Sequence, residues 1–192
     1  LIDLGCKPDT RIAYYGKNSD FFFEVLIGTL KSNTVTVGVN WRLAPPEVSY
    51  VLNDSESEVL FVGADFYPVI DQILEDLPKI KKVVAIDGDH ENYQDYISWR
   101  NSQNSANPEI KSSPNDDILQ LYTSGTTGHP KGVQLTNENF AAANESIDGI
   151  VPFEEGSTNL VCMPGYHVAG TNWGIWGLSL IHISEPTRLE SI

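Results

Sequence analysis

The sequence predicts an α/β fold in which mainly parallel β-strands form a sheet flanked by helices. Three observations lead to this prediction. Short runs rich in valine, isoleucine and aromatic residues recur along the chain. Their apolar residues are mostly continuous, which suits strands covered on both faces. Segments with helical spacing separate the runs, and this alternation is typical of a parallel sheet.

Each expected strand is a short apolar run bounded by polar or turn-forming residues. The loop at residues 101–117 is rich in Asn, Ser and Pro, so we expect it to cross the surface and lead into a strand. The expected strands are residues 11–15, 34–39, 58–63, 82–86, 118–123 and 159–163.

Four helices are expected between these strands. Ser19 is a suitable N-cap for a helix over residues 20–31. The sequence Pro45-Pro46-Glu47 predicts the start of a second helix, because proline suits a first helical turn and an acid suits the helix dipole. Residues 66–77 and 137–150 have the apolar spacing of two more helices.

Composition restricts the possible partners and the compartment. The 192 residues carry a net charge of −14, which argues against nucleic acid or an anionic membrane surface as a partner. No run approaches the ~18 apolar residues of a membrane span, so no integral membrane segment is expected. Cys6 and Cys162 lack the spacing of a metal or redox site, which favours a reducing, cytoplasmic compartment.

The stretch LYTSGTTGHPKGV, residues 121–133, gathers hydroxyl groups and glycines around one lysine. Glycines let backbone N–H groups converge on an anion, and hydroxyls and an ammonium add donors for phosphate. The spacing fits neither the P-loop nor the dinucleotide-binding glycine pattern. The residues expected to bind a polyphosphate are Thr123, Ser124, Gly125, Thr126, Thr127, Gly128 and Lys131.

The string T-S-G-T-T-G-x-P-K-G resembles the signature of the adenylate-forming superfamily, which includes acyl-CoA synthetases, luciferases and peptide-synthetase adenylation domains. The resemblance implies that a carboxylate attacks the α-phosphate of Mg-ATP, and that a thiol, usually of coenzyme A, then displaces AMP. Lys131 would hold the leaving pyrophosphate as a catalytic residue. Thr126 or Thr127 would reach the Mg²⁺ bound to ATP. The fold would be part of the large N-terminal domain of such an enzyme.

A second segment, NLVCMPGYHVAGTNWG at residues 159–174, resembles the motif in which an aromatic–His pair enters the acyl pocket. Relatives that activate amino acids carry an Asp in place of the histidine, so His167 disfavours an amino-acid substrate. His167 would donate a hydrogen bond near the carboxylate as a second catalytic residue. The expected substrate-binding residues are Tyr166, His167, Val168, Ala169, Gly170 and Trp173.

Residues 18–63 are similar to the early part of acyl-CoA synthetases, and residues 40–43 (NWRL) are especially close to the fatty-acid members. We expect this segment to be scaffold without a reacting group. Ser32-Asn33 stands where the family has an Ala-Gly pair, and asparagine tolerates the positive φ of such a turn. We interpret His90, His129 and Asp116-Asp117 as solvated positions rather than ligands or bases.

The tail LSLIHISEPTRLESI, residues 178–192, does not continue the resemblance. Residues 178–188 read as the frame translation of a sequencing-library adapter, so we expect the tail to be non-native. The chain also begins at Leu1. We therefore expect residues 1–177 to be a partial AMP-binding domain, with the C-terminal domain of the family absent.

These features predict a parent enzyme that activates a carboxylic acid, most closely a fatty acid, with ATP, Mg²⁺ and coenzyme A. One alternative is an adenylation enzyme that loads another thiol, such as that of a carrier protein. A second alternative is a non-catalytic nucleotide-binding remnant. The isolated chain is expected to be inactive in each case, and the sequence does not indicate the oligomeric state.

Overall fold

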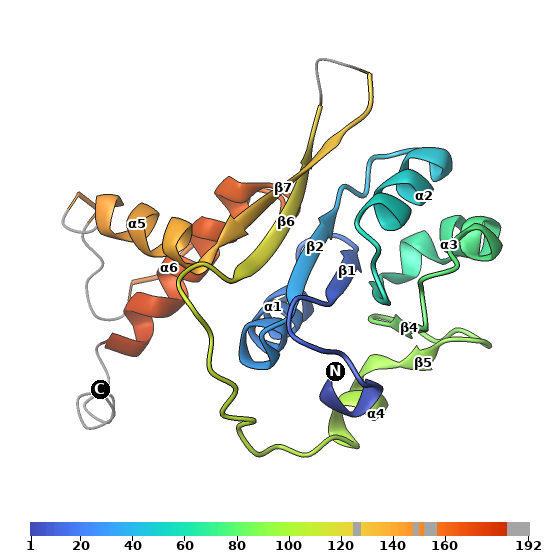
Figure 1. The fold of residues 1–192 in the computed structure, drawn as a ribbon, viewed down its shortest axis with the longest axis horizontal. Helices are drawn as coiled ribbons and strands as arrows, with labels where there is room; N and C mark the ends of the chain where they lie inside the picture. The colour runs from blue at the N-terminus through green and yellow to red at the C-terminus, as the bar shows by residue number, and fades with distance from the viewer. Residues whose placement is uncertain (125–127, 148–149, 152–156, 184–192) are drawn as a thin grey trace.

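The computed structural model describes residues 1–124, 128–147, 150–151 and 157–183, with side chains described as far as residue 178. In this part of the chain, seven strands form one sheet in the order β5-β4-β3-β1-β2-β6-β7 (Figure 1). Neighbouring strands are parallel except β6 and β7, which form an antiparallel hairpin. The prediction of an α/β fold with a mainly parallel sheet is confirmed.

Five of the six expected strands form within one residue of their predicted ends. All residues of β2 and β3 are buried, as their continuous apolar runs predict. β5 and β7 were not anticipated. The strands are β1 (Arg11–Tyr15), β2 (Val35–Val39), β3 (Val59–Val62), β4 (Lys82–Ala85), β5 (Gln94–Asp95), β6 (Asp117–Thr123) and β7 (Lys131–Thr136).

The strand expected at residues 159–163 is wrong. This segment is irregular, and Leu160 and Met163 are 75% and 40% exposed. An apolar run becomes a strand only when a neighbouring strand satisfies its backbone, and no described strand lies beside this segment.

Helices cover both faces of the sheet (Figure 1). α1 and α4 pack with β1 and β3 on one face, while α2 and α3 pack on the other. α5 and α6 lie beside the β6–β7 hairpin at the far end of the sheet. The helices are α1 (Asp20–Ser32), α2 (Pro45–Asp54), α3 (Tyr67–Ile73), α4 (Tyr96–Asn101), α5 (Asn137–Ile147) and α6 (Val168–Ile183), with 3₁₀ turns η1 (Ile2–Leu4), η2 (Ala64–Phe66) and η3 (Leu74–Asp76).

The helix boundaries follow local chemistry, with two departures from the sequence-based expectations. Ser19 is the N-cap residue of α1, but its hydroxyl bonds the Tyr14 hydroxyl at 2.9 Å and makes no capping bond. The helix expected at residues 66–77 is divided into η2, α3 and η3. Asn33 ends α1 with a φ of 53°, which confirms the positive-φ turn.

α6 was not anticipated, and it continues past residue 177, where the expected domain ends. The assignment of residues 178–192 as a non-native tail is not decided by this helix and stays a prediction, and residues 184–192 lie outside the described part of the chain. Among the described helices, none has the length and apolar character needed to span a membrane.

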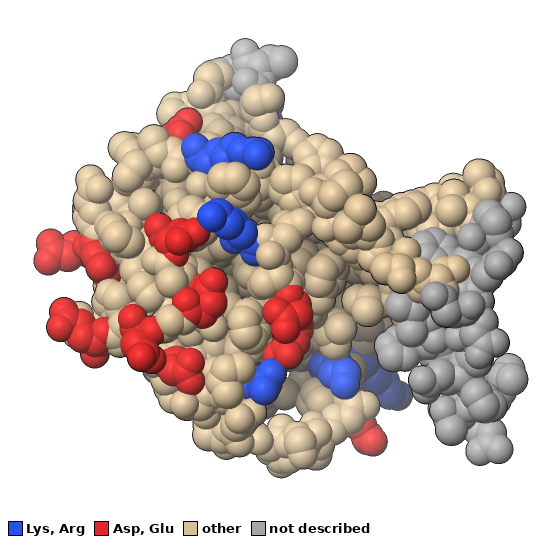
Figure 2. All heavy atoms as spheres, turned by 180° about the vertical axis from the view of Figure 1, so that it is seen from behind, with Lys and Arg blue, Asp and Glu red and all other residues tan. Residues whose placement is uncertain are grey.

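Charge is unevenly spread over the surface. On the face shown in Figure 2, acidic side chains outnumber basic ones and gather toward one side. The basic side chains on this face are interspersed among acids rather than joined in one broad patch. Such a face does not offer the continuous positive surface that a nucleic-acid backbone requires.

Candidate functional site

The two motifs singled out in the sequence meet at the carboxyl edge of the parallel sheet. β2 and β6 are neighbours, with Gly38 of β2 opposite Leu121 of β6. β6 ends two residues later at Thr123, where the glycine-rich loop begins. The backbone of Tyr166 lies over Gly38, because a Cβ atom built on this glycine would stand 3.0 Å from the Tyr166 Cα. Carboxyl edges of parallel strands are the usual place for ligand sites in α/β folds.

The glycine-rich loop is the tip of the β6–β7 hairpin. Thr123, the last residue of β6, pairs with Lys131, the first residue of β7. The side chains of Thr123, Ser124 and Lys131 are exposed, so all three are available to a ligand. Gly125, Thr126 and Thr127 lie outside the described residues, and so does the predicted contact of Thr126 or Thr127 with magnesium.

Gly128 has the backbone that the sequence leads us to expect of an anion-binding loop. Its φ is +98°, a conformation that residues with a side chain rarely adopt, and the space around a Cβ there is open. Lys131 forms no ion pair with the described residues. An exposed ammonium beside an open glycine backbone fits a phosphate group.

The segment 163–167, which we call the aromatic–His loop, is held by side chains from distant elements. Asn18 Nδ2 donates to the Met163 carbonyl at 2.8 Å, and Asn18 Oδ1 accepts from the Gly165 N–H at 2.8 Å. The Thr171 hydroxyl donates to the Gly165 carbonyl at 2.6 Å. These bonds fix the backbone that presents Tyr166 and His167.

His167 is exposed and immediately precedes α6. Its Nδ1 accepts the Ala169 N–H at 3.2 Å, as an N-cap side chain does. With Nδ1 acting as the acceptor, the neutral imidazole carries its proton on Nε2. His167 can therefore donate a hydrogen bond from Nε2 while it caps the helix, and its donor role toward a carboxylate stays a prediction.

The remaining residues predicted to line the acyl pocket divide into two groups. Val168 and Ala169 line a cavity of about 230 Å³ between α5 and α6, together with Leu135, Phe140 and Ala143. Gly170 is buried against the Pro164 carbonyl, where a Cβ would clash, and Trp173 packs on Trp176 with ring centroids 5.1 Å apart. Gly170 and Trp173 are absent from the described lining of this cavity, and their contacts support the fold of α6.

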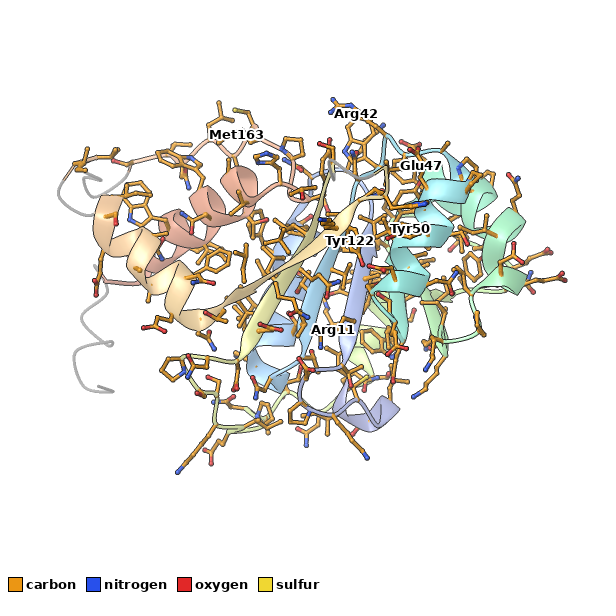
Figure 3. The ribbon with its side chains drawn as sticks, turned by 45° about the horizontal axis from the view of Figure 1, so that its top comes forward. Arg11, Arg42, Glu47, Tyr50, Tyr122 and Met163 are labelled. Carbon is orange, nitrogen blue, oxygen red and sulfur yellow. The ribbon has the colours of Figure 1, made fainter. Side chains whose placement is uncertain are left out.

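Arg42 was not recognised as a site residue because the segment 18–63 was expected to be scaffold. Its guanidinium lies 4.4 Å from the centre of the Trp41 ring and donates to the Tyr166 hydroxyl at 2.9 Å. The Trp41 and Tyr166 rings meet edge-on at 6.4 Å. An exposed arginine thus holds the aromatic member of the aromatic–His loop, and it lies near the top of the molecule with Met163 in Figure 3.

The hairpin is held by a series of polar contacts along its length. Arg11 Nε donates to Gln120 Oε1 at 3.2 Å, and Gln120 Nε2 donates to the Tyr122 hydroxyl at 3.1 Å. Tyr122 donates in turn to Asp54 of α2 at 2.6 Å. Burial and this bond to Asp54 raise the pKa of Tyr122, so its hydroxyl stays protonated. The motif did not predict these contacts, because Arg11, Gln120 and Asp54 reach Tyr122 only through the fold.

The other candidate ligands occupy supporting positions. His129 is exposed as expected, but its ring stacks on Tyr50 with centroids 5.2 Å apart. His90 is 13% exposed and bonds Asp71 at 3.2 Å, so its interpretation as a solvated residue is wrong. Asp116 accepts bonds from Ser113 and Asn33, and Asp117 pairs with Arg11. Within the described residues, no cluster of three His, Cys, Asp or Glu side chains forms a metal site.

Comparison with known proteins places this geometry in a family. The sequence pattern of the family described as AMP-binding enzyme matches residues 1–182. Fatty acid–[acyl-carrier-protein] ligase ScoC of Streptomyces coeruleorubidus is 38% identical over 175 residues, which cover 88% of this chain and 32% of that protein. Long-chain-fatty-acid–CoA ligase FadD13 of Mycobacterium tuberculosis is 34% identical over 190 residues, covering 96% of this chain and 37% of that protein.

Solved structures agree with the fold. The inhibitor-bound crystal structure of the N-terminal domain of FACL13 from Mycobacterium tuberculosis superposes with a TM-score of 0.82 at 32% identity, covering 92% of this chain and 44% of that one. The fatty acyl CoA synthetase of the same organism gives a TM-score of 0.82 at 31% identity, with coverage of 93% and 34%.

The chain spans about a third of the length of its curated relatives, at 32% and 37%. The match to the family pattern nevertheless covers nearly all of the chain, and it includes both the hairpin and the aromatic–His loop. The sequence pattern and the fold therefore agree, and this chain belongs to the AMP-binding enzyme family.

Proposed function

We propose that this chain forms the ATP- and acid-binding part of an AMP-forming acid–thiol ligase that acts on a fatty or similar carboxylic acid. The observation that carries the proposal is the placement of two loops at the same edge of the sheet. The hairpin tip presents Lys131, and the aromatic–His loop, seated over Gly38 of the neighbouring strand, presents His167.

In the proposed reaction, a carboxylate oxygen attacks the α-phosphorus of ATP, and the bond to the pyrophosphate oxygen breaks. The products of this step are an acyl-adenylate and pyrophosphate. A thiolate then attacks the acyl carbon, and AMP leaves with the oxygen that came from the carboxylate. Lys131 stabilises charge on the departing phosphates, and His167 donates from Nε2 toward the carboxylate. Magnesium would arrive bound to the ATP phosphates.

The nature of the acid follows from two features. The exposed His167 offers no negative charge to an α-ammonium group, which disfavours amino acids. The cavity that begins at Val168 and Ala169 is lined largely by apolar side chains, which suits an alkyl chain. Both features support a fatty acid or another apolar acid as the substrate.

Two acceptors are supported by the relatives. The name of ScoC assigns that protein an acyl-carrier-protein acceptor, and the name of FadD13 assigns that protein coenzyme A. We propose coenzyme A as the first candidate, because the FadD13 match covers more of this chain than the ScoC match does. A carrier-protein thiol is the second candidate, because the ScoC match has the higher identity of the two.

The experiment uses the longer protein that we propose carries this chain. Exchange of labelled pyrophosphate into ATP is measured with a fatty acid, an aryl acid and an amino acid. Exchange that depends on the fatty acid supports the proposal, whereas exchange driven by the amino acid alone contradicts it. Thioester formation with coenzyme A or a pantetheinylated carrier protein then identifies the acceptor. We expect no exchange from the 192-residue chain alone.

A further inference from the structure

The Tyr50 side chain connects the tip of the β6–β7 hairpin to helix α2. The Tyr50 hydroxyl donates to the Pro130 carbonyl at 3.1 Å, and its ring stacks on His129 with an interplanar angle of 27°. Both partners directly precede Lys131, the first residue of β7. Figure 3 shows Tyr50 beside Tyr122, with both side chains between α2 and the hairpin.

The hairpin depends on such a contact because of its place in the sheet. β7 is the edge strand of the described sheet, and its residues are exposed or half-buried. The antiparallel ladder pairs Lys131 with Thr123 of the same hairpin, so it positions these two residues relative to each other and not relative to α2. Tyr50 supplies a contact to the tip from a helix that follows the neighbouring strand β2.

A second hydrogen bond between α2 and the hairpin lies close to the Tyr50 contact. Tyr122, one residue before the end of β6, donates to Asp54 Oδ2 at 2.6 Å, one helical turn from Tyr50. Tyr50 also lies 3.5 Å from Asp54 Oδ1, a longer contact than its bond to Pro130. A phenol has one proton, so the better geometry favours donation to the Pro130 carbonyl. α2 therefore holds β6 through Asp54 and β7 through Tyr50.

We propose that Tyr50 is a positioning residue for ATP, which acts by setting the location of Lys131 at the phosphates. This inference rests on the proposed function for the reaction in which ATP is used. The contacts of Tyr50 with His129 and Pro130 do not depend on that function. It predicts that loss of Tyr50 weakens the productive interaction with ATP and leaves the interaction with the carboxylic acid unchanged.

The test compares Tyr50→Phe and Tyr50→Ala with the unmodified longer protein. Tyr50→Phe keeps the ring on His129 and loses the bond to Pro130, so we expect KM for ATP to rise by about fivefold. Tyr50→Ala loses both contacts, and a rise of about 10- to 100-fold is expected. KM for the fatty acid should stay within about twofold in both variants.

A double variant separates positioning from general loss of stability. If Tyr50 acts through Lys131, then Tyr50→Ala should have little further effect in a Lys131→Ala background. Tyr93→Phe is the matched control, because it removes a tyrosine–aspartate bond to Asp71 near β5, at the opposite end of the sheet. That control should leave both KM values unchanged.

Equilibrium binding of ATP and amide hydrogen exchange at residues 128–131 provide readouts that need no turnover. We expect weaker ATP binding and faster exchange in Tyr50→Ala, even if the longer protein fails to activate a fatty acid. Absence of fatty-acid activation would overturn the proposed function but would leave the role of Tyr50 open to these two measurements. Equal changes in the KM values for ATP and acid, or unchanged ATP binding in Tyr50→Ala, would overturn the role of Tyr50.

Discussion

The side-chain amide of Asn18 faces the backbone of Gly165 across 147 positions of sequence and accepts its N–H at 2.8 Å. The same amide donates to the Met163 carbonyl, so it satisfies one backbone acceptor and one backbone donor, as a neighbouring β-strand would. The aromatic–His loop is therefore attached to the turn between β1 and α1 and does not depend on its neighbours in sequence alone.

Replacing Asn18 with Ala should loosen the aromatic–His loop. Two backbone groups lose their partners, and we expect a loss of about 1–3 kcal/mol in the free energy of unfolding. KM for the acid should rise while KM for ATP changes little. Thermal unfolding and initial rates at varied acid concentration check this. Asn18→Asp keeps the acceptor but loses the donor, so an Asp variant equal to the unmodified protein would contradict the paired role.

Lys131→Ala should slow formation of the adenylate by about 10- to 1000-fold, because the departing phosphates lose a charge partner. Lys131→Arg keeps the charge and should retain more of the rate. Single-turnover release of pyrophosphate is the measurement. Since Lys131 is exposed, the folded state should keep its stability in both variants. An unchanged rate in the alanine variant would remove Lys131 from the reaction.

His167→Ala removes a helix cap and the proposed donor together, whereas His167→Asn keeps an oxygen that can cap α6. The Ala variant should lose about 0.5–2 kcal/mol of stability, and the Asn variant should lose less. Both should slow adenylate formation. If the Asn variant is as fast as the unmodified protein, the imidazole serves the fold and is not needed for the reaction.

Gly38→Ala should destabilise the site. Its Cβ would lie 2.9 Å from a methyl group of Leu121 and 3.0 Å from the Tyr166 Cα, and the backbone cannot move away freely. A loss of about 1–3 kcal/mol is expected, measured by denaturant unfolding. Gly28→Ala is the control, because its surroundings are open and it lies inside helix α1. That variant should gain up to about 1 kcal/mol.

Stability at acid pH should depend on Asp71. The hydrogen bond from Tyr93 and the nearby His90 hold the pKa of Asp71 below its usual value. A carboxyl whose pKa is lower in the folded state stabilises above its unfolded pKa of about 3.9, and this stabilisation is lost as the pH falls through the folded value. In the Tyr93→Phe variant, the midpoint of denaturant unfolding should therefore fall less between neutral pH and pH values below about 4 than it does in the unmodified protein. Identical acid profiles would contradict this account.

The sequence was informative where one local property determined the structure. The continuous apolar runs of β1, β2 and β3 favoured buried strands, Pro45-Pro46-Glu47 favoured a helix start, and the structure confirms both. The hairpin lysine and the histidine before α6 were singled out because their motifs are long and specific, and their roles stay predictions.

The sequence was less informative where structure depends on distant partners. The apolar segment at residues 159–163 has no neighbouring strand in the described sheet, so propensity alone gave the wrong prediction. Ser19 was expected to cap α1 with its side chain, but its hydroxyl forms a hydrogen bond with the Tyr14 hydroxyl instead. Asn18, Arg42 and Tyr50 belong to the site through contacts that span 80 or more positions, and no pattern within a short window reveals such contacts.

The central claim is that the acid is activated as an adenylate. The most direct measurement supplies the longer protein with ATP, thiol and a fatty acid labelled with ¹⁸O in its carboxylate, and then analyses the phosphate products by mass spectrometry. The account predicts one labelled oxygen in AMP and none in pyrophosphate. Labelled oxygen in inorganic phosphate, or unlabelled AMP formed together with thioester, would contradict it.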